Sequence, residues 1–186
     1  MIAGLVLAGG RSTRFGSEKA IAPLDGRTLM EWALEALRPH CGPLAVSARP
    51  GSGAAALTAR LGLPVIEDAL HAPDGPLAGI AAGLRWASSL GAEHLATLPC
   101  DMPRAPTNLI PRLAAARGEA FAAFAVAPDG PHPLCALWSI DLLASLEASL
   151  AHGHPAVRAF LRDVGGVAAE FDDAAAFANL NRPADS

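Results

Sequence analysis

Short apolar runs alternate with helix-like segments through the first two thirds of this chain, and this alternation restricts its fold more than any other feature. The first run, Ile2–Leu7, is followed by a pair of glycines and is typical of a buried strand. Strands that alternate with helices favour a mainly parallel sheet covered by helices on both faces. We therefore predict an α/β, Rossmann-like three-layer fold with a mostly parallel mixed central sheet.

The individual elements can be placed by residue range. Thr28 and Glu31 have the spacing of a capping box, and apolar residues follow at helical intervals as far as Leu37. Pro76 is expected to open a longer helix that reaches residue 90. Further strands are predicted at 44–47, 63–66, 94–98, 121–126, 134–138 and 167–171, and further helices at 53–60, 108–117, 140–151 and 156–163. No repeat or linker interrupts this order, so residues 1–186 are predicted to form a single domain.

Composition limits the classes of partner. The net charge is −4 and no basic patch is interleaved with aromatic side chains, so we expect no nucleic-acid binding, and an anionic ligand needs a local positive site. The widely spaced Cys41, Cys100 and Cys135 lack a C-x-x-C pattern, which predicts buried reduced thiols. No basic leader precedes the first strand, and no apolar run is long enough to span a bilayer. We therefore expect a cytoplasmic protein without membrane contact.

The only lysine of the chain, Lys19, ends a glycine-rich loop after the first predicted strand. The loop reads Leu7-Ala8-Gly9-Gly10-Arg11-Ser12-Thr13-Arg14-Phe15-Gly16-Ser17-Glu18-Lys19. Backbone N–H groups of such a turn point at anions, and a lysine adds a flexible point charge for a phosphate. Neither the P-loop pattern nor the dinucleotide fingerprint fits this loop. A surface turn with a solvated lysine is the competing interpretation.

Two acidic residues, Asp68 and Asp101, also follow predicted strands. Ligands of open α/β sheets bind outside the carboxyl ends of the strands, so the loop and both acids converge on one crevice if these strands are neighbours. Asp101 lies between two prolines and is a candidate Mg²⁺ ligand, because Mg²⁺ takes one or two protein carboxylates together with phosphate oxygens and water. For Asp101 taken alone, a turn or helix-capping role is an equal alternative.

Other features leave two interpretations open. Gly79 and Gly83 fit either the close approach of a ligand or tight packing of a helix on a strand. His132 is either a ligand contact or part of a turn. His152 and His154 lack partners at metal-binding spacing, which favours a solvated loop. No Ser-His-Asp, Cys-His or nucleophile-elbow pattern is present, so the sequence does not predict covalent catalysis.

The order of these motifs resembles one family over nearly the full chain. The loop is similar to the signature loop of nucleotidyltransferases with the nucleotide-diphospho-sugar transferase fold. It is followed by Val65-Ile66-Glu67-Asp68, Gly75-Pro76-Leu77-Ala78-Gly79, Pro99-Cys100-Asp101-Met102-Pro103, His132-Pro133 and Phe177-Ala178-Asn179-Leu180-Asn181-Arg182-Pro183-Ala184-Asp185. The loop alone identifies the superfamily. The whole series, with its Asn-x-Asn-x-Pro terminus, resembles the molybdenum cofactor guanylyltransferases.

This resemblance implies a reaction in which GTP and molybdopterin give the guanine dinucleotide form of the cofactor and pyrophosphate. The residues that it implies are Leu7, Ala8, Gly9 and Gly10 at the nucleotide, Lys19 and Arg14 at the phosphates, Asp68 at the guanosine, and Asp101 at Mg²⁺. Acceptor molybdoenzymes or their chaperones are candidate partners. The pterin is expected near segments 132–138 and 152–162, where Arg158 and Arg162 could bind its phosphate. A solvated basic helix face explains these two arginines equally well.

Two departures from the family pattern bear on specificity. Glu18 replaces the aspartate that usually precedes the lysine, and we expect little effect because the charge is kept. Ala48 stands where relatives carry an asparagine that helps to hold the nucleotide, so base selection would rest on backbone groups or on Ser47. A cytidylyl- or sugar-phosphate transferase of the same fold is an alternative, although Gly9 favours guanine because cytosine relatives usually have alanine there. A non-catalytic nucleotide-binding regulatory module is a second alternative.

Overall fold

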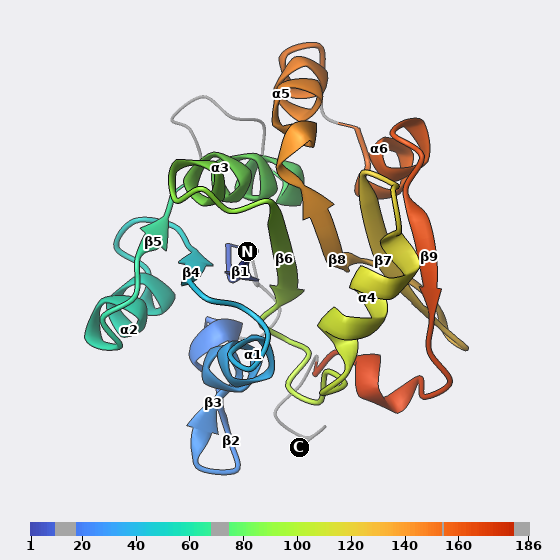
Figure 1. Cartoon of the computed structure of the whole chain (residues 1–186). Helices are drawn as coiled ribbons and strands as arrows, with labels where there is room; N and C mark the ends of the chain where they lie inside the picture. The colour runs from blue at the N-terminus through green and yellow to red at the C-terminus, as the bar shows by residue number, and fades with distance from the viewer. Residues whose placement is uncertain (10–17, 68–74, 154, 181–186) are drawn as a thin grey trace.

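A seven-stranded mixed sheet lies at the centre of the molecule and sets the position of the other elements (Figure 1). The computed structural model describes residues 1–9, 18–67, 75–153 and 155–180, and the elements named here belong to this part of the chain. The strand order is β5-β4-β1-β6-β8-β7-β9. The predicted α/β fold with a mostly parallel mixed sheet is confirmed.

One half of the sheet is entirely parallel. Its strands are β1 (Ile2–Leu7), β4 (Leu44–Ser47), β5 (Val65–Ile66) and β6 (His94–Pro99). β1 lies between β4 and β6, so that Leu7 is paired with Ser47 on one side and with Pro99 on the other. The last residues of these three adjacent strands are therefore level with one another. Chain segments that follow them start at the same edge of the sheet.

The sheet changes direction at β8 (Gly130–Ser139), which runs antiparallel to both β6 and β7 (Ala122–Ala127). β7 then pairs in parallel with the edge strand β9 (Val167–Glu170). The predicted turn at 127–130 is confirmed, because Ala127 pairs with Gly130, whose φ of 125° suits glycine alone. Since β6 and β7 both run opposite to β8, their carboxyl ends lie at the same edge.

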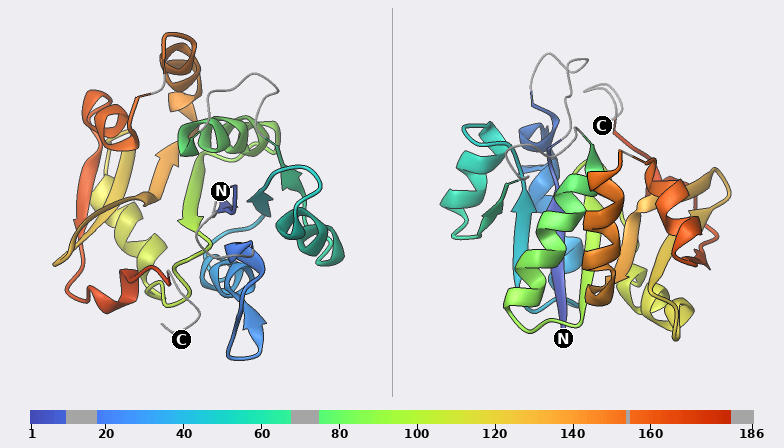
Figure 2. Two further views of the ribbon diagram at one scale, coloured as in Figure 1. Left: turned by 180° about the vertical axis from the view of Figure 1, so that it is seen from behind. Right: turned by 90° about the horizontal axis from the view of Figure 1, so that it is seen from above.

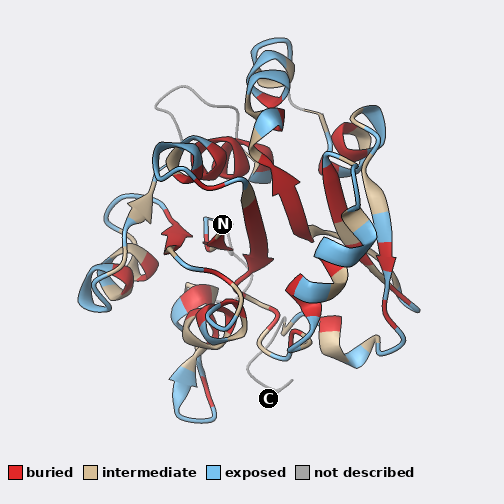
Figure 3. Ribbon diagram, viewed as in Figure 1, coloured by how far each residue is buried: buried red, intermediate tan, exposed pale blue. Residues whose placement is uncertain are grey.

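Helices cover both faces of the sheet, as predicted (Figures 1 and 2). One face carries α3 (Pro76–Ser89), α5 (Leu143–Ala151) and α6 (Val157–Asp163), and the other carries α1 (Leu29–Leu37), α2 (Gly53–Arg60) and α4 (Leu109–Arg117). Alternate residues of each strand enter the two apolar layers: Leu5 packs on the α3 side and Val6 on the α1 side. Buried residues line the sheet and the inner sides of the helices (Figure 3). Within the described residues, no helix is both long and apolar enough to cross a membrane.

The sequence analysis missed a small hairpin formed by β2 (Pro23–Leu24) and β3 (Arg27–Thr28). Its turn residues, Asp25 and Gly26, have φ values of 47° and 80°. An Asp-Gly pair with two positive φ values is a common two-residue hairpin turn. The signal was present in the sequence, but strands of two residues leave no alternating apolar pattern around it. The hairpin leads directly into the predicted capping box, in which Thr28 and Glu31 cap each other's backbone N–H groups.

Several predicted bounds shift by a few residues. The strand expected at 63–66 is limited to Val65–Ile66, and β8 begins at Gly130 instead of residue 134. The helix expected at 140–151 begins with a 3₁₀ turn, Ile140–Leu142, before α5. The types of the elements were thus predicted more reliably than their first and last residues. The spacing of apolar residues identifies a helix or a strand, whereas local hydrogen bonds determine where it begins and ends.

For Gly83, the structure distinguishes between the close approach of a ligand and tight packing of a helix on a strand. A Cβ atom added at this position would lie 2.5 Å from Leu5 Cδ2 and 3.0 Å from Leu95 Cδ2. Both leucines belong to strands of the sheet, so this glycine lets α3 approach β1 and β6 closely. At Gly83, helix–sheet packing is therefore the reason for the small residue.

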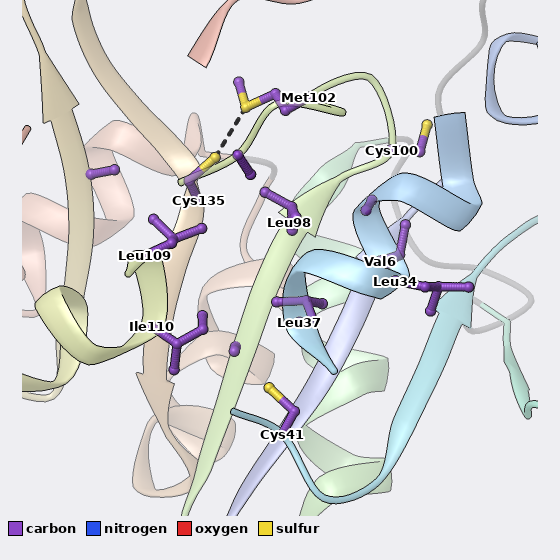
Figure 4. Close-up of a cluster of buried hydrophobic side chains, with 14 of the residues drawn as sticks. Val6, Leu34, Leu37, Cys41, Leu98, Cys100, Met102, Leu109, Ile110 and Cys135 are labelled. Atoms are coloured by element: carbon purple, nitrogen blue, oxygen red, sulfur yellow. Dashed lines mark hydrogen bonds between the residues drawn. The ribbon is translucent and has the colours of Figure 1, made fainter. Parts of the chain in front are cut away.

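All three cysteines are buried and free, as predicted. Figure 4 shows them in the apolar layer on the α1 side of the sheet, where the Cys135 thiol lies 3.1 Å from Met102 Sδ. Burial raises the pKa of Cys41 to about 12 and the pKa of Cys135 further. These thiols act as small apolar side chains in the core.

Candidate active site

The chain that leaves β1 is fixed between the ends of its two neighbours. Ala8 donates its N–H to Ser47 O at 2.8 Å, and Cys100 donates its N–H to Leu7 O at 3.1 Å. Gly9 follows at an exposed position, and no atom of the described residues lies within 4 Å of where its Cβ would be. The predicted contact residues Leu7, Ala8 and Gly9 therefore lie directly beside the ends of β4 and β6.

Lys19 and Asp101 meet at this edge of the sheet. Nζ of Lys19 donates a hydrogen bond to Oδ2 of Asp101 at 2.7 Å. Their side chains are 14% and 21% exposed, so this is a partly buried ion pair that solvent still reaches. Residues 82 positions apart in the sequence are thus brought together, as expected if their strands were neighbours. A solvated lysine on a surface turn is excluded by this contact.

The backbone around Lys19 is held on both sides. Lys19 opens a 3₁₀ turn, Lys19–Ile21, whose middle residue Ala20 is only 1% exposed and belongs to the apolar layer under α1. The residue before it, Glu18, accepts N–H groups from Gly53 and Ala54 at the start of α2. The backbone that carries the lysine is therefore anchored by packing on one side and by hydrogen bonds on the other.

A C-terminal segment also reaches the site. Leu180 donates its N–H to Asp101 O at 3.1 Å, so Asn179 lies next to the carboxylate-bearing turn. Phe177, which is 1% exposed, anchors this segment by stacking on His132 with a centroid distance of 4.7 Å. Nε2 of His132 lies 3.0 Å from Oδ1 of Asp129. His132 thus contacts the turn between β7 and β8, in line with one of the two interpretations left open for it, and it also holds the C-terminal segment, which was not predicted.

Some predicted site residues lie outside the described part of the chain. These are Gly10, Arg14 and Asp68, as well as His154. Asp68 follows β5, which is separated from β1 by β4, so its strand is a second neighbour of the central strand. Among the described residues, His152 contacts its own helix through Ala148 O at 2.8 Å and takes no part in the site.

The end of β4 is formed by buried residues. Ser47 and Ala48 are 5% and 4% exposed, so neither offers an exposed polar side chain. Their backbone groups are already engaged, because Ser47 O accepts from Ala8 and Ala48 N donates to Ile66 O at 3.3 Å. These bonds fix β4 to its neighbours at the point where the nucleotide loop begins.

The described part of the site offers one carboxylate beside Lys19, that of Asp101. No group of three or more His, Cys, Asp or Glu side chains that could bind a metal occurs within residues 1–9, 18–67, 75–153 and 155–180. The donor set therefore does not suit an all-protein site for Zn²⁺ or Ca²⁺. One carboxylate on a stiff turn does suit Mg²⁺, which completes its coordination with phosphate oxygens and water.

Cys100 lies beside Asp101 but does not have the properties of a nucleophile. Burial raises the pKa of its thiol to about 12, and the neighbouring Asp101 charge adds to this effect. The residue is 8% exposed. Because the thiolate is the reactive form, this thiol is inert near neutral pH. The site therefore offers charge and hydrogen bonds, and no described side chain is activated for covalent attack.

A lysine, a carboxylate and the start of a glycine-containing turn at the ends of adjacent parallel strands are typical of α/β enzymes that bind nucleotides and act on phosphate groups. Comparison with known proteins makes this class specific. The family model of the MobA-like NTP transferase domain matches residues 4–169. The chain belongs to this family and is a nucleotidyltransferase.

Relatives match over almost the whole chain. A protein from Cereibacter sphaeroides named molybdenum cofactor guanylyltransferase is 45% identical over 183 residues, which are 98% of this chain and 92% of the relative. A protein of the same name from Yersinia pestis is 36% identical over 186 residues, 99% of this chain and 92% of the relative. The crystal structure of molybdopterin-guanine dinucleotide biosynthesis protein A from Archaeoglobus fulgidus has a TM-score of 0.78 at 28% identity. The match covers 100% of this chain and 94% of the Archaeoglobus fulgidus chain. The family resemblance inferred from the motifs is confirmed.

The properties of Cys100 give a direct prediction. Iodoacetamide at pH 7.5 should leave Cys100 unmodified in the native protein, because its protonated and buried thiol does not react, whereas all three cysteines should react after unfolding in urea. Cys100→Ala should keep its catalytic rate within about threefold, since the change removes only a small buried apolar group. Peptide mass spectrometry and a pyrophosphate-release assay measure both outcomes. A native adduct at Cys100 that abolishes turnover would show that the thiol is part of the chemistry.

Proposed function

We propose that this nucleotidyltransferase transfers GMP from GTP to molybdopterin, which gives the guanine dinucleotide cofactor and pyrophosphate. The observation that carries the proposal is the Lys19–Asp101 pair, at 2.7 Å, at the level ends of β1 and β6. The name shared by relatives at 45% and 36% identity supports GTP and molybdopterin as the substrates. The proposed activity therefore combines a site suited to a triphosphate with the acceptor of the relatives.

The reaction is an in-line displacement at phosphorus. An oxygen of the molybdopterin phosphate forms a bond to the α-phosphorus of GTP, and the bond from that phosphorus to the oxygen that bridges to the β-phosphate breaks. The bonding electrons leave with pyrophosphate. Because the attacking phosphate is already ionised, no strong general base is needed, and the protein contributes positioning and charge neutralisation.

The two charged residues take complementary roles in this scheme. Asp101 would hold Mg²⁺, which would supply charge neutralisation for the phosphate groups. Lys19 would bind phosphate oxygens and stabilise the departing pyrophosphate, together with Arg14 and the N–H groups of the loop. Each residue would thereby exchange its present partner for a ligand of opposite charge, so neither charge is left unpaired.

The nucleoside would lie over β1, β4 and the end of β5. Leu7, Ala8, Gly9 and Gly10 would contact the nucleotide by backbone approach, and Asp68 would bind the guanosine. Ala48 cannot replace the side-chain amide that relatives carry, and Ser47 is buried beside it. Guanine selection would therefore depend on Asp68 and on backbone groups.

The acceptor would lie on the antiparallel half of the sheet. A cleft of about 490 Å³ there is lined by apolar side chains, among them Phe124 and Leu161, and by Arg158 and Arg162 of α6. β7, which carries Phe124, is two strand spacings from β6, or ~10 Å. An aromatic ring with an anionic group fits an apolar cleft that carries two guanidinium groups. Arg162 is 78% exposed and is paired with the neighbouring Asp163, as a solvated helix face would be, so it is the apolar lining of the cleft that supports acceptor binding here.

Two alternatives have specific arguments. A cytidylyl- or sugar-phosphate transferase would share the fold, and the glycine at position 9 argues against the cytidylyl enzyme. A non-catalytic nucleotide-binding module would not need a lysine and a carboxylate in contact. Delivery of the product to acceptor molybdoenzymes or their chaperones is compatible with catalysis. A cytoplasmic setting fits the three free cysteines.

The nucleotide preference tests the function as a whole. Pyrophosphate release should be fast only with GTP and molybdopterin together, and at least about tenfold slower with CTP, ATP or UTP, since a lost base contact costs about 1.4 kcal/mol or more. The product should be identified by mass spectrometry as the guanine dinucleotide. Equal rates with CTP and GTP would argue for the cytidylyl alternative, and no release with any nucleotide would favour the binding module.

Removal of either charged residue tests the site. Lys19→Ala and Asp101→Ala should each lower kcat on the order of 10²-fold or more, because each removes one preorganised electrostatic contact to the triphosphate. Circular dichroism and thermal unfolding should show that both variants are folded. In the Asp101 variant, added Mg²⁺ should not restore the rate. Wild-type turnover by folded Asp101→Ala would remove the metal assignment.

Replacement of the arginines tests the acceptor site. Arg158→Ala and Arg162→Ala should raise KM for molybdopterin about tenfold or more with little change in KM for GTP, because a charge-assisted hydrogen bond contributes ~1.5–3 kcal/mol. Arg85→Ala is the matched control, because Arg85 is an exposed arginine of another helix, paired there with Glu147. If all three variants had unchanged KM for molybdopterin, Arg158 and Arg162 would be part of a solvated surface.

A further inference from the structure

Glu18 bridges the nucleotide loop and helix α2. Its Oε2 accepts the N–H of Gly53 at 2.6 Å, and its Oε1 accepts the N–H of Ala54 at 2.9 Å. The contact joins residues 35 positions apart. Both oxygens of one carboxylate are therefore used by the first two residues of a helix. Such charge-assisted hydrogen bonds are shorter and stronger than neutral ones, and the positive end of the helix dipole adds to them.

The start of α2 depends on this carboxylate. The first N–H groups of a helix have no partner within the helix itself. At α2, Ser52 N donates to Arg49 O and Ala55 N donates to the Ser52 hydroxyl at 3.1 Å. The two remaining donors, on Gly53 and Ala54, are taken by Glu18. A side chain from the nucleotide loop thus completes the cap that Ser52 begins.

The space between the loop and the helix is fitted to this contact. A Cβ atom on Gly53 would lie 3.0 Å from Oε2 of Glu18 and 2.7 Å from Cδ1 of Ile21. A larger residue would therefore displace the ends of the Ile21 and Glu18 side chains and disturb the hydrogen bonds that Glu18 makes to α2. Glu18 and Ile21, which lie on either side of Lys19 in the sequence, approach position 53 closely, and this explains why a glycine is found there.

These contacts complete a ring through the site. β4 is paired with β1, and β1 is paired with β6, which leads to Asp101. From β4 the chain continues to α2, whose first residues hold Glu18. The next residue, Lys19, returns to Asp101 through its 2.7 Å contact. The position of the lysine relative to the carboxylate is therefore set by the α2 start as well as by the sheet.

We propose that Glu18 is a positioning residue that fixes Lys19 against Asp101 by gripping the N-terminus of α2. This inference rests on the proposed role of Lys19 at the triphosphate. Glu18 itself does not touch the reacting groups, and its effect on the rate passes through the lysine. A substitution of Glu18 would leave Lys19 in place in the sequence but remove a contact that fixes its position. The carboxylate also occupies a helix end that would otherwise attract a phosphate, so the triphosphate is left to the loop and Lys19.

A double-mutant cycle separates positioning from general support of the fold. Glu18→Ala should lower kcat/KM for GTP about tenfold, because a small misplacement of a charged group costs much of its benefit. Glu18→Gln, which keeps the shape and one acceptor oxygen, should give a smaller loss. In the Lys19→Ala background, Glu18→Ala should change the rate by less than about twofold, since there is no ammonium left to position. Pyrophosphate release with GTP and molybdopterin is the measurement.

Ser52→Ala is the matched control, because it removes another hydrogen bond from the same helix end without touching the loop. It should lower the unfolding temperature by less than Glu18→Ala, because it removes one neutral hydrogen bond instead of two charge-assisted ones, and it should leave kcat/KM within about twofold. The proposal would be overturned if Glu18→Ala lowered kcat/KM by the same factor in the wild-type and Lys19→Ala backgrounds. It would also be overturned if both folded Glu18 variants had wild-type activity while Lys19→Ala was impaired. If Lys19→Ala itself kept full activity, the role of Lys19 in the proposed function would fail, and this inference with it.

Discussion

The contact between Lys19 and Asp101 depends on the pairing of β1 with β6, because this pairing ends both strands at the same level of the sheet. Pairing of Leu7 with Pro99 brings the two segments to the same height at the sheet edge. Two opposite charges that are mostly withdrawn from water are tolerated only as a pair, because each alone would carry an uncompensated desolvation cost. In the proposed reaction, a triphosphate with its metal ion would offer each residue a new partner of the right sign. The pair would then exchange partners and would not be a permanent structural contact.

The reversal of the sheet at β8 gives the molecule two different working surfaces. The parallel half ends in the loop of residues 7–9, Lys19 and Asp101, where charge is concentrated. The antiparallel half carries an apolar cleft beneath α6. Because β6 and β7 end at the same edge, a donor over the first half and an acceptor over the second can meet above β6 and β8. The C-terminal segment ties the halves together, since Phe177 stacks on His132 of β8 and Leu180 reaches Asp101.

Sequence alone was sufficient to predict the fold and to place Lys19 and Asp101 at one edge of the sheet. Alternating apolar runs placed the main strands and helices, and the lone lysine and Asp101 were recognised from their positions after strands. The hairpin at Asp25–Gly26 was missed because its strands are too short to show a period. The Glu18 contact was missed for a different reason. Its charge was considered, but its partners are backbone N–H groups at Gly53 and Ala54, which carry no sequence signal.

The site cannot be assigned to the glycine-rich loop alone, because its contacts join residues that are far apart in the sequence. Glu18 reaches across 35 residues and Lys19 across 82, so both contacts exist only after β4, β1 and β6 have paired. An isolated loop peptide would have the same charges without their geometry, and preorganised geometry is what makes charges effective in catalysis. Residues at the start of α2 therefore influence the site through the loop that they hold. In this fold, the arrangement of the phosphate-binding groups is a property of the sheet and its first crossover helix together.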